Sequence, residues 1–446
     1  MKSQGRYLPA ALAGLGLALP HIALAQNADR GGLQANLTYT EQFFYDDDDE
    51  DNETSLRSNL EFELLSETRS QSLSFVLAGG VEKGLSDGFS LDLEDPRIAL
   101  AYSIGSRNTE LSFNASFRSI EVDDLSVLDF DLATLVDDPG DREDFNTGVA
   151  LEFGREARFG ATLSAGYSET NFVNTASPEV IDSERIDGSV RLRFDLSRTA
   201  IGFLTASISD LDRDANGLDV ETREIIASLD VEITPSLTGA FDLGYREITR
   251  GGSETGTSEG ISFGASLSAA RPNGTISAIL DSAVEETGRR STFQVNRALT
   301  LPRGELSAGI GVSFNSETDS TDPLYNIRYS QALPRGSFNV DFSQSFSTTN
   351  TGVETLNTVF NVSANQALNE ISSLSAGISF SDSDRLSSSA ADTRRVRYEI
   401  DYSRELTSRW SLVAGIAHTQ RRESGGENSS DNEVFLGLRT ALSWRP

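Results

Sequence analysis

The stretch from Ser291 to Ser347 constrains the fold most, because apolar side chains recur at every second position through four consecutive segments. Alternation with a period of two predicts β-strands that have one apolar and one polar face. Two of the joints share the sequence Leu-Pro-Arg-Gly, at 301–304 and 333–336, where Pro sets φ and Gly relieves strain in a tight turn. The joint between them, Glu317 to Pro323, is longer, polar and acidic.

The same rhythm extends from Leu33 to the end of the chain, with short joints after even-numbered segments and longer polar joints after odd-numbered ones. Alternating segments joined in turn by short and long joints predict an all-β fold, namely a transmembrane antiparallel up-and-down β-barrel. We count about 22 strands, and 18 or 20 remain open because weakly alternating segments are easily miscounted. The first strand follows residue 26 closely, which predicts a barrel without a plug domain.

Composition agrees with a barrel rather than with a large soluble core. Hydrophobic residues make up 37% of the chain and cysteine is absent. A barrel needs only every second strand residue to be apolar, so a modest apolar content with strong alternation is expected. The missing cysteines exclude disulfides and cysteine-metal sites.

The first 25 residues have the pattern of a cleaved signal peptide. Lys2 and Arg6 precede an apolar run from Leu8 to Leu19, and Ala23-Leu24-Ala25 is a small-x-small cleavage site. The alternative is an uncleaved membrane helix, for which the apolar run is short. We therefore predict a signal peptide at 1–25 and a barrel at 26–446.

The last segment, from Glu433 to Pro446, supplies a resemblance to a known class. Val434, Leu436, Leu438, Leu442 and Trp444 share one parity, and the segment resembles the closing C-terminal strand of Gram-negative outer-membrane β-barrels. The chain departs from that pattern by ending in Trp444-Arg445-Pro446 instead of an aromatic residue. Among families it is most similar to large, plug-less β-barrel porins. The resemblance implies location in the outer membrane, with outer-membrane lipid, lipopolysaccharide and the outer-membrane assembly machinery as partners.

The formal net charge of −31 bears on the function. Nucleic-acid binding is excluded as a function class, since it needs a basic surface that replaces counterions. A strongly acidic chain instead favours divalent cations or a cationic solute. Acidic loops that keep a surface protein hydrated would give the same balance.

Charged residues on the polar parity are the candidate lining of a pore. Opposed charges across a lumen can set a transverse field that filters solutes. A wide polar lumen also needs hydrated charged side chains in any case, so no single residue is decisive. The candidate lumen-lining residues are Glu61, Glu63, Arg185, Asp187, Arg191, Arg193, Asp195, Asp230, Arg328, Arg395, Arg397, Glu399, Asp401 and Arg439.

Two acidic segments are candidate cation sites or constrictions. Asp212, Asp214 and Asn216, followed by Gly217, match the start of a calcium loop, but Arg223 stands where a bidentate Glu is expected. An acidic hairpin tip is the alternative, and otherwise no cofactor is predicted.

The long loop at about 122–144 either folds inwards to narrow the pore or forms an extracellular cap.

Enzymatic functions lack the necessary residues. Outside the predicted signal peptide the only histidine is His418, whose parity places it on the lipid-facing wall, and no serine motif accompanies it. We therefore expect a non-enzymatic, porin-like channel for passive passage of small hydrophilic solutes, with a preference for cations. The alternatives are an export pore for an exopolysaccharide, a non-conducting adhesin or structural barrel, and an outer-membrane lipase.

Overall fold

A computed structural model describes residues 32–48, 52–85, 92–122, 140–175, 181–213, 219–251, 255–348, 354–386, 393–423 and 428–445. The predicted signal peptide at 1–25 lies outside these residues. No helix in the described part of the chain is long and apolar enough to cross a membrane.

The described residues form one sheet of 22 antiparallel strands, in which each strand pairs with the next along the chain. The strands are β1 (Leu33–Asp48), β2 (Asn52–Glu67), β3 (Gln71–Gly84), β4 (Asp92–Gly105), β5 (Thr109–Glu121), β6 (Asp141–Phe153), β7 (Phe159–Val173), β8 (Ser183–Asp195), β9 (Ala200–Arg213), β10 (Val220–Thr234), β11 (Leu237–Arg250), β12 (Gly256–Arg271), β13 (Gly274–Glu285), β14 (Gly288–Leu301), β15 (Gly304–Asn315), β16 (Ser320–Leu333), β17 (Gly336–Thr348), β18 (Glu354–Ala367), β19 (Ser372–Arg385), β20 (Thr393–Glu405), β21 (Trp410–Glu423) and β22 (Asn428–Trp444).

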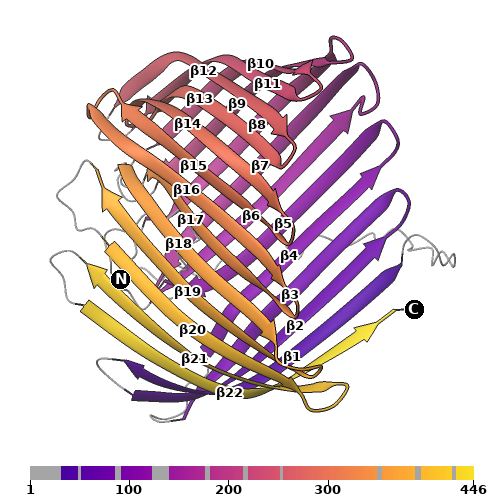
Figure 1. The fold of residues 1–446 in the computed structure, drawn as a ribbon, viewed down its shortest axis with the longest axis vertical. Helices are drawn as coiled ribbons and strands as arrows, with labels where there is room; N and C mark the ends of the chain where they lie inside the picture. The colour runs from indigo at the N-terminus through magenta and orange to yellow at the C-terminus, as the bar shows by residue number, and fades with distance from the viewer. Residues whose placement is uncertain are drawn as a thin grey trace, which may run out of the picture.

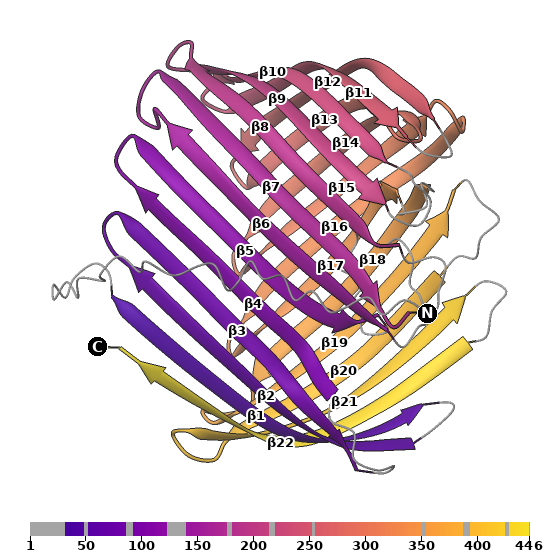
Figure 2. The same ribbon diagram turned by 180° about the vertical axis from the view of Figure 1, so that it is seen from behind.

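The sheet closes on itself because β1 pairs with β22 over almost its whole length, from Ala35 opposite Trp444 to Asp48 opposite Asp431. Figures 1 and 2 show opposite sides of the resulting wall of strongly tilted strands, with the first and last strands side by side. Closure leaves the sheet without a free edge, which is the condition for a β-structure in hydrocarbon. The predicted count of 22 and the all-β barrel class are confirmed.

One face of the wall is apolar, and no other part of the described chain covers it. Residues directly opposite one another share a face, and one such row contains Leu77, Ile98 and Phe117 on β3, β4 and β5. Large apolar side chains remain exposed all around the barrel, among them Leu163, Ile225, Ile310 and Leu436. A soluble monomer rarely exposes a continuous apolar band, whereas lipid covers one.

Joints after the even-numbered strands are short, and most joints after the odd-numbered strands are longer. We call the two rims the short-turn end and the loop end. The Leu-Pro-Arg-Gly sequences form the turns at 302–303 and 334–335, as predicted. One exception is the joint between β13 and β14, which consists only of residues 286–287 at the loop end.

The strands extend further into the predicted loops than the sequence indicated. The run of acidic residues from Asp46 to Glu53 is polar enough to predict a loop, but its first and last residues belong to β1 and β2, and Asp46 lies opposite both Glu53 and Glu433. The predicted loop at 122–144 ends earlier, because β6 begins at Asp141. Residues 123–139 of that loop lie outside the described residues, so the constriction hypothesis for them stays a prediction.

Two hairpins leave the wall near the loop end. Pairing between β12 and β13 begins only at Phe263 opposite Ser282, although β12 starts at Gly256. Pairing between β16 and β17 begins only at Asn326 opposite Ser343, although β16 starts at Ser320. The β13–β14 tip (residues 283–290) and the β17–β18 tip (344–348 and 354–357 of the described residues) are therefore not tied to the preceding strand.

The turn at Gly274 provides a test of the short-turn geometry. Its φ is +128°, and a Cβ there would meet the carbonyl of Ala298 on β14. Gly274→Ala should lower the free energy of unfolding by about 1–3 kcal/mol, because a non-glycine residue is strained in this conformation. Urea unfolding of the folded barrel in lipid vesicles measures the loss. Gly256→Ala is the matched control, since a Cβ there meets nothing within 4 Å; an equal loss in both variants would contradict the prediction.

Candidate functional site

Contacts between strands that are distant in the sheet identify the inner face. Arg213 at the end of β9 forms an ion pair of 3.5 Å with Glu286, between β13 and β14. Three strands separate β9 from β13 along the wall, so the contact is made across the concave side. Arg213 shares its face with Asp187 and Ser209 through the β8–β9 register. The polar parity therefore faces the interior of the barrel.

The β13–β14 tip lies against the inner face of β9–β11. Val284 packs in a buried cluster with Leu211, Val220 and Ile248, one from each of these strands. The Arg246 guanidinium on β11 donates to the backbone oxygen of Val284 at 3.2 Å and to the Glu285 carboxylate at 3.1 Å. Apolar packing and charged hydrogen bonds thus hold the tip inside the barrel.

The β17–β18 tip lies against the inner face of β14–β16. Glu354 at the start of β18 accepts from the Arg290 Nε atom on β14 at 2.9 Å and from the Asn315 Nδ2 atom on β15 at 3.0 Å. The Arg290 guanidinium also lies 3.7 Å from the ring centroid of Phe346 on β17. Sequence parity groups Phe346 with the lipid-facing Phe338 and Phe342; that assignment is wrong, because the strand has left the wall by this point.

The two tips are connected through buried polar groups. The side chains of Arg290 and Glu354 are 10% and 4% exposed, and Asn315 is fully buried. Arg290 also donates to Ser313 Oγ at 2.7 Å, and the Asn315 amide donates to the backbone oxygen of Thr287 in the first tip at 3.2 Å. We call Arg290, Asn315 and Glu354 the tip latch. A buried charge is stable only when it is paired and hydrogen-bonded, and here it is both.

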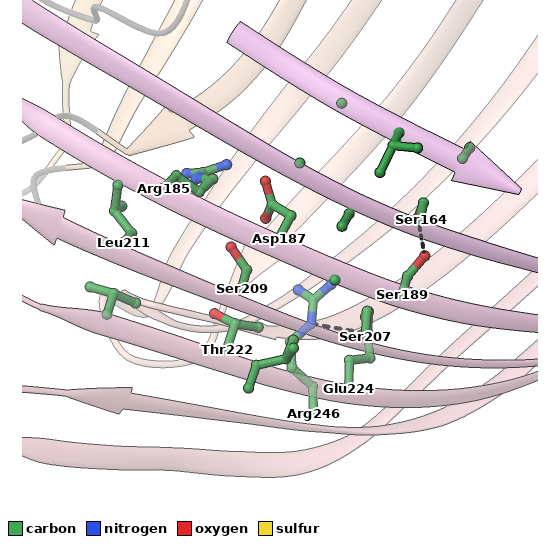
Figure 3. Close-up of a pocket in the computed structure, with 18 of the residues that line it drawn as sticks. Ser164, Arg185, Asp187, Ser189, Ser207, Ser209, Leu211, Thr222, Glu224 and Arg246 are labelled. Carbon is green, nitrogen blue, oxygen red and sulfur yellow. Dashed lines mark hydrogen bonds and ion pairs between the residues drawn. The ribbon is translucent and has the colours of Figure 1, made fainter. Parts of the chain in front are cut away.

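A cavity of about 600 Å³ lies on the inner wall beside the first tip. It is lined from β5 to β11, and Glu285 and Glu286 of the tip complete it. Figure 3 shows its wall, where Arg246 bonds Glu224 and Ser164 bonds Ser189. The remaining polar side chains there include Arg185, Asp187, Ser209 and Thr222.

The sequence-predicted lumen residues occupy the inner parity but act differently from one another. Arg193 donates from Nη2 to the carbonyls of Gly154, Arg155 and Ala157, at 2.9, 3.0 and 2.7 Å, and so holds the β6–β7 turn. Arg191 packs on the ring of Phe203, with its Cζ atom 4.1 Å from the centroid.

Several of the others are paired with neighbouring strands. Arg328 bonds Asp341 at 2.7 Å, and Glu63 accepts from Asn36 at 2.9 Å. The Arg397 Nε atom lies 3.6 Å from the Glu399 carboxylate, and its Nη2 atom lies 3.7 Å from the Glu433 carboxylate. Arg395 is 6% exposed, whereas Glu61 and Arg439 are exposed. Asp401 lies opposite Gly415 on β21. These residues are spread around the barrel and do not converge on one site.

A group of charged residues at the loop end of the first strands was not among the residues predicted from sequence. Arg57 pairs with Glu82 at 2.9 Å and with Glu94 at 3.7 Å, and its Cζ atom lies 4.4 Å from the ring centroid of Phe44. Alternation alone placed Arg57 and Glu82 on the polar face. Their meeting with Glu94 depends on the bulge between Ala78 and Gly80, for which Gly79-Gly80 was the available sequence signal.

The calcium hypothesis falls partly outside the described residues, since Asp214 and Asn216 are not among them. Asp212 is exposed and ends on the outer parity, opposite Glu184. Desolvation, followed by the charge and hydrogen bond of Asp212, raises the pKa of the Asp219 carboxyl above its usual value. The described part of the chain contains no group of three or more His, Asp or Glu side chains that could hold a metal ion.

His418 lies on the outer face, opposite Asn432. Its Nδ1 atom is 2.8 Å from the Asn432 amide oxygen and its Nε2 atom is 2.9 Å from the Gln420 amide nitrogen. The imidazole also stacks on Tyr398, with 6.3 Å between ring centroids. Both ring nitrogens therefore contact side-chain amides.

Comparison with known proteins places this architecture among solved barrels. No family model matches the chain, and no curated protein does. The ferric-catecholate import receptor Fiu from E. coli K12 superimposes with a TM-score of 0.57 and 10% identity, over 93% of this chain and 82% of that one.

Other siderophore receptors are similar. The ferric enterobactin receptor PfeA from Pseudomonas aeruginosa, as the R480A mutant with enterobactin, gives a TM-score of 0.57 at 11% identity, over 91% of this chain and 81% of that one. PirA from Acinetobacter baumannii gives 0.53 at 9% identity, over 91% and 80%. At these identities the likeness concerns the fold, which is that of an outer-membrane β-barrel.

The tip latch predicts a difference between buried and exposed ion pairs. Glu354→Gln leaves the Arg290 charge buried without its partner, which should lower the free energy of unfolding by about 3–5 kcal/mol. Urea unfolding in vesicles, followed by the fluorescence of Trp410 and Trp444, measures this.

The matched control is the exposed pair of Arg328 and Asp341, whose side chains are 77% and 33% exposed. Asp341→Asn should cost less than about 1 kcal/mol. Similar small losses in Glu354→Gln and Asp341→Asn would show that the latch does not hold the tips.

Proposed function

We propose that this outer-membrane β-barrel is a passive channel for small hydrophilic solutes, without enzymatic activity, and that it prefers cations. The observation that carries the proposal is the closed wall of 22 strands with an apolar outer face and a polar, charged inner face. Lipid covers the outer face, and the inner face offers hydrated groups along which a polar solute can pass. Import is what one structural neighbour is named for, and transport across the membrane fits such a wall.

The proposal includes a barrel that carries no plug domain. The described residues from Leu33 to Trp444 all belong to strands or to joints between strands, and none of them forms a separate domain inside the wall. The folded-in tips and the network around Arg57 narrow the interior at the loop end instead. We propose that the loop end is extracellular and the short-turn end periplasmic, as the pattern of long and short joints suggests.

The preference for cations follows from charge. The formal net charge is −31, and carboxylates such as Glu61 and Glu63 line the inner wall. A pore whose walls carry one sign of charge concentrates the opposite ion. Export of an exopolysaccharide would use the same inner charges, and an adhesin would use the acidic loop end without conducting. Conductance separates the adhesin from the two pore functions, and polymer secretion by a deletion strain separates the two pores.

Planar-bilayer recording of the purified, folded protein tests the channel. We expect discrete conductance steps and, in a salt gradient, a reversal potential of the sign that marks cation preference. An absence of steps would remove the channel function, and an anion-selective reversal potential would remove the charge argument.

The double variant Glu61→Gln and Glu63→Gln should lower the cation-to-anion permeability ratio, because it removes two inner carboxylates. The matched control is Glu247→Gln, which removes one carboxylate from the outer parity, opposite Arg223. Reversal potentials in the same salt gradient measure both. An equal shift in the control would show that the effect does not arise in the lumen.

A further inference from the structure

Two glycines face each other on the wall of the cavity beside the β13–β14 tip. Gly148 on β6 lies directly opposite Gly166 on β7, and Gly166 lies opposite Asp187 on β8. All three line the cavity. The position opposite Asp187 on β7 therefore carries no side chain, and the Asp187 Oδ2 atom is 4.0 Å from the point that a Cβ on Gly166 would occupy, whereas the Asn114 amide lies over Gly148.

Two oppositely charged side chains of this wall are not used by the fold. Arg185 and Asp187 are two residues apart on β8, so they point into the cavity from the same face of one strand. Both are exposed. Neither forms a hydrogen bond or ion pair with another described residue, and no dashed line reaches them in Figure 3.

The other charges of the cavity are already paired. Arg246 bonds Glu224 at 2.9 Å and Glu285 at 3.1 Å, and Glu286 pairs with Arg213 at 3.5 Å. These pairs hold the tip and leave one free cation and one free anion among the described lining residues. A ligand that matches them has one carboxylate and one ammonium group.

The rest of the wall fits a small, hydroxyl-compatible ligand. Ser189, Ser207, Ser209 and Thr222 supply hydroxyl groups on β8, β9 and β10 beside the two charges. No aromatic side chain is among the described lining residues, so the wall offers no flat surface on which a ring could stack. Hydroxyls donate and accept, and so they suit a polar ligand of either orientation.

We propose that this cavity is a binding site for small zwitterions of the amino-acid type. The guanidinium of Arg185 binds the carboxylate, the carboxylate of Asp187 binds the ammonium group, and the serine and threonine hydroxyls contact the remaining polar atoms. The inference rests on the proposed channel function, which brings solutes to this wall. Zwitterions that pass through the barrel then bind in the cavity on their way.

A matched set of four probes tests the site: L-serine with both charges, glycerate with the carboxylate only, serinol with the ammonium only, and glycerol with neither. Saturation-transfer NMR titrations of the folded protein in detergent micelles give each affinity. We expect L-serine to bind about threefold or more tighter than each of the other three, because it alone satisfies both charged groups.

Two variants assign the charges. Arg185→Gln should reduce L-serine binding to the level of serinol while leaving serinol binding unchanged, which also shows that the variant is folded. Asp187→Asn should reduce L-serine binding to the level of glycerate and leave glycerate binding unchanged. Arg404→Gln is the control, since it removes an exposed guanidinium that lies opposite Leu412, away from the cavity; it should leave all four affinities unchanged.

The proposal is overturned if the four probes bind alike, or if Arg185→Gln and Asp187→Asn keep the wild-type preference for L-serine. These binding measurements do not depend on ion flow. A barrel that gives no conductance steps but prefers L-serine through Arg185 and Asp187 would lack the proposed channel function and still have the site. A conducting barrel without this preference would have the channel function and lack the site.

Discussion

The pairing of backbone donors and acceptors is the constraint on which this structure depends. Hydrocarbon offers no hydrogen bonds, so each backbone group in the membrane must find its partner within the protein. The pairing of β1 with β22 meets this requirement by removing both edges of the sheet. Closure also fixes which parity faces outward, since a shift of one residue would turn every apolar side chain inward.

At the loop end not every backbone group is paired with a neighbouring strand, and the two hairpin tips fold into the barrel there. Where the β13–β14 and β17–β18 hairpins leave the wall, side chains replace the missing ladder: Arg289 donates to the Ile261 carbonyl at 2.8 Å, and Gln344 accepts from the Tyr325 amide at 3.1 Å. The freed tips then bury the charges of the tip latch and of Arg213. The same departure bounds the cavity, because Glu285 and Glu286 of the first tip line it together with the wall from β5 to β11.

The amino-acid sequence predicted the wall because the wall is built from local regularities. Alternation from Leu33 onward and the two Leu-Pro-Arg-Gly turns depend on neighbouring residues, and 22 strands and the inner parity follow from them. The tips were not predictable in this way. Residues such as Phe346 and Val284 continue the apolar parity of their strands. Contacts between residues far apart in the chain, such as that of Arg290 with Glu354, 64 residues apart, show that the strands have turned inward.

The roles of individual charged residues likewise depend on contacts that the sequence pattern does not show. Arg193 was grouped with pore residues because its parity is inward, whereas three carbonyls of the β6–β7 turn occupy its guanidinium. Arg185 has the same parity and a similar sequence context, but the described residues leave it without a partner. Sequence shows that a charge faces inward; whether it is available to a solute depends on its neighbours in space.

The closing pair of strands also governs how the barrel is made. One edge of β1 pairs with β2, but the other edge finds its partner only when β22 exists, so the whole chain must be synthesised and exported before the wall can be complete. Contacts between the two ends of a chain form slowly, and unpaired apolar strands are prone to aggregate meanwhile. The excess of carboxylates, with a net charge of −31, repels one such unfolded chain from another. The excess of carboxylates on which the proposed cation preference rests therefore also keeps unfolded chains apart until the last strand is made.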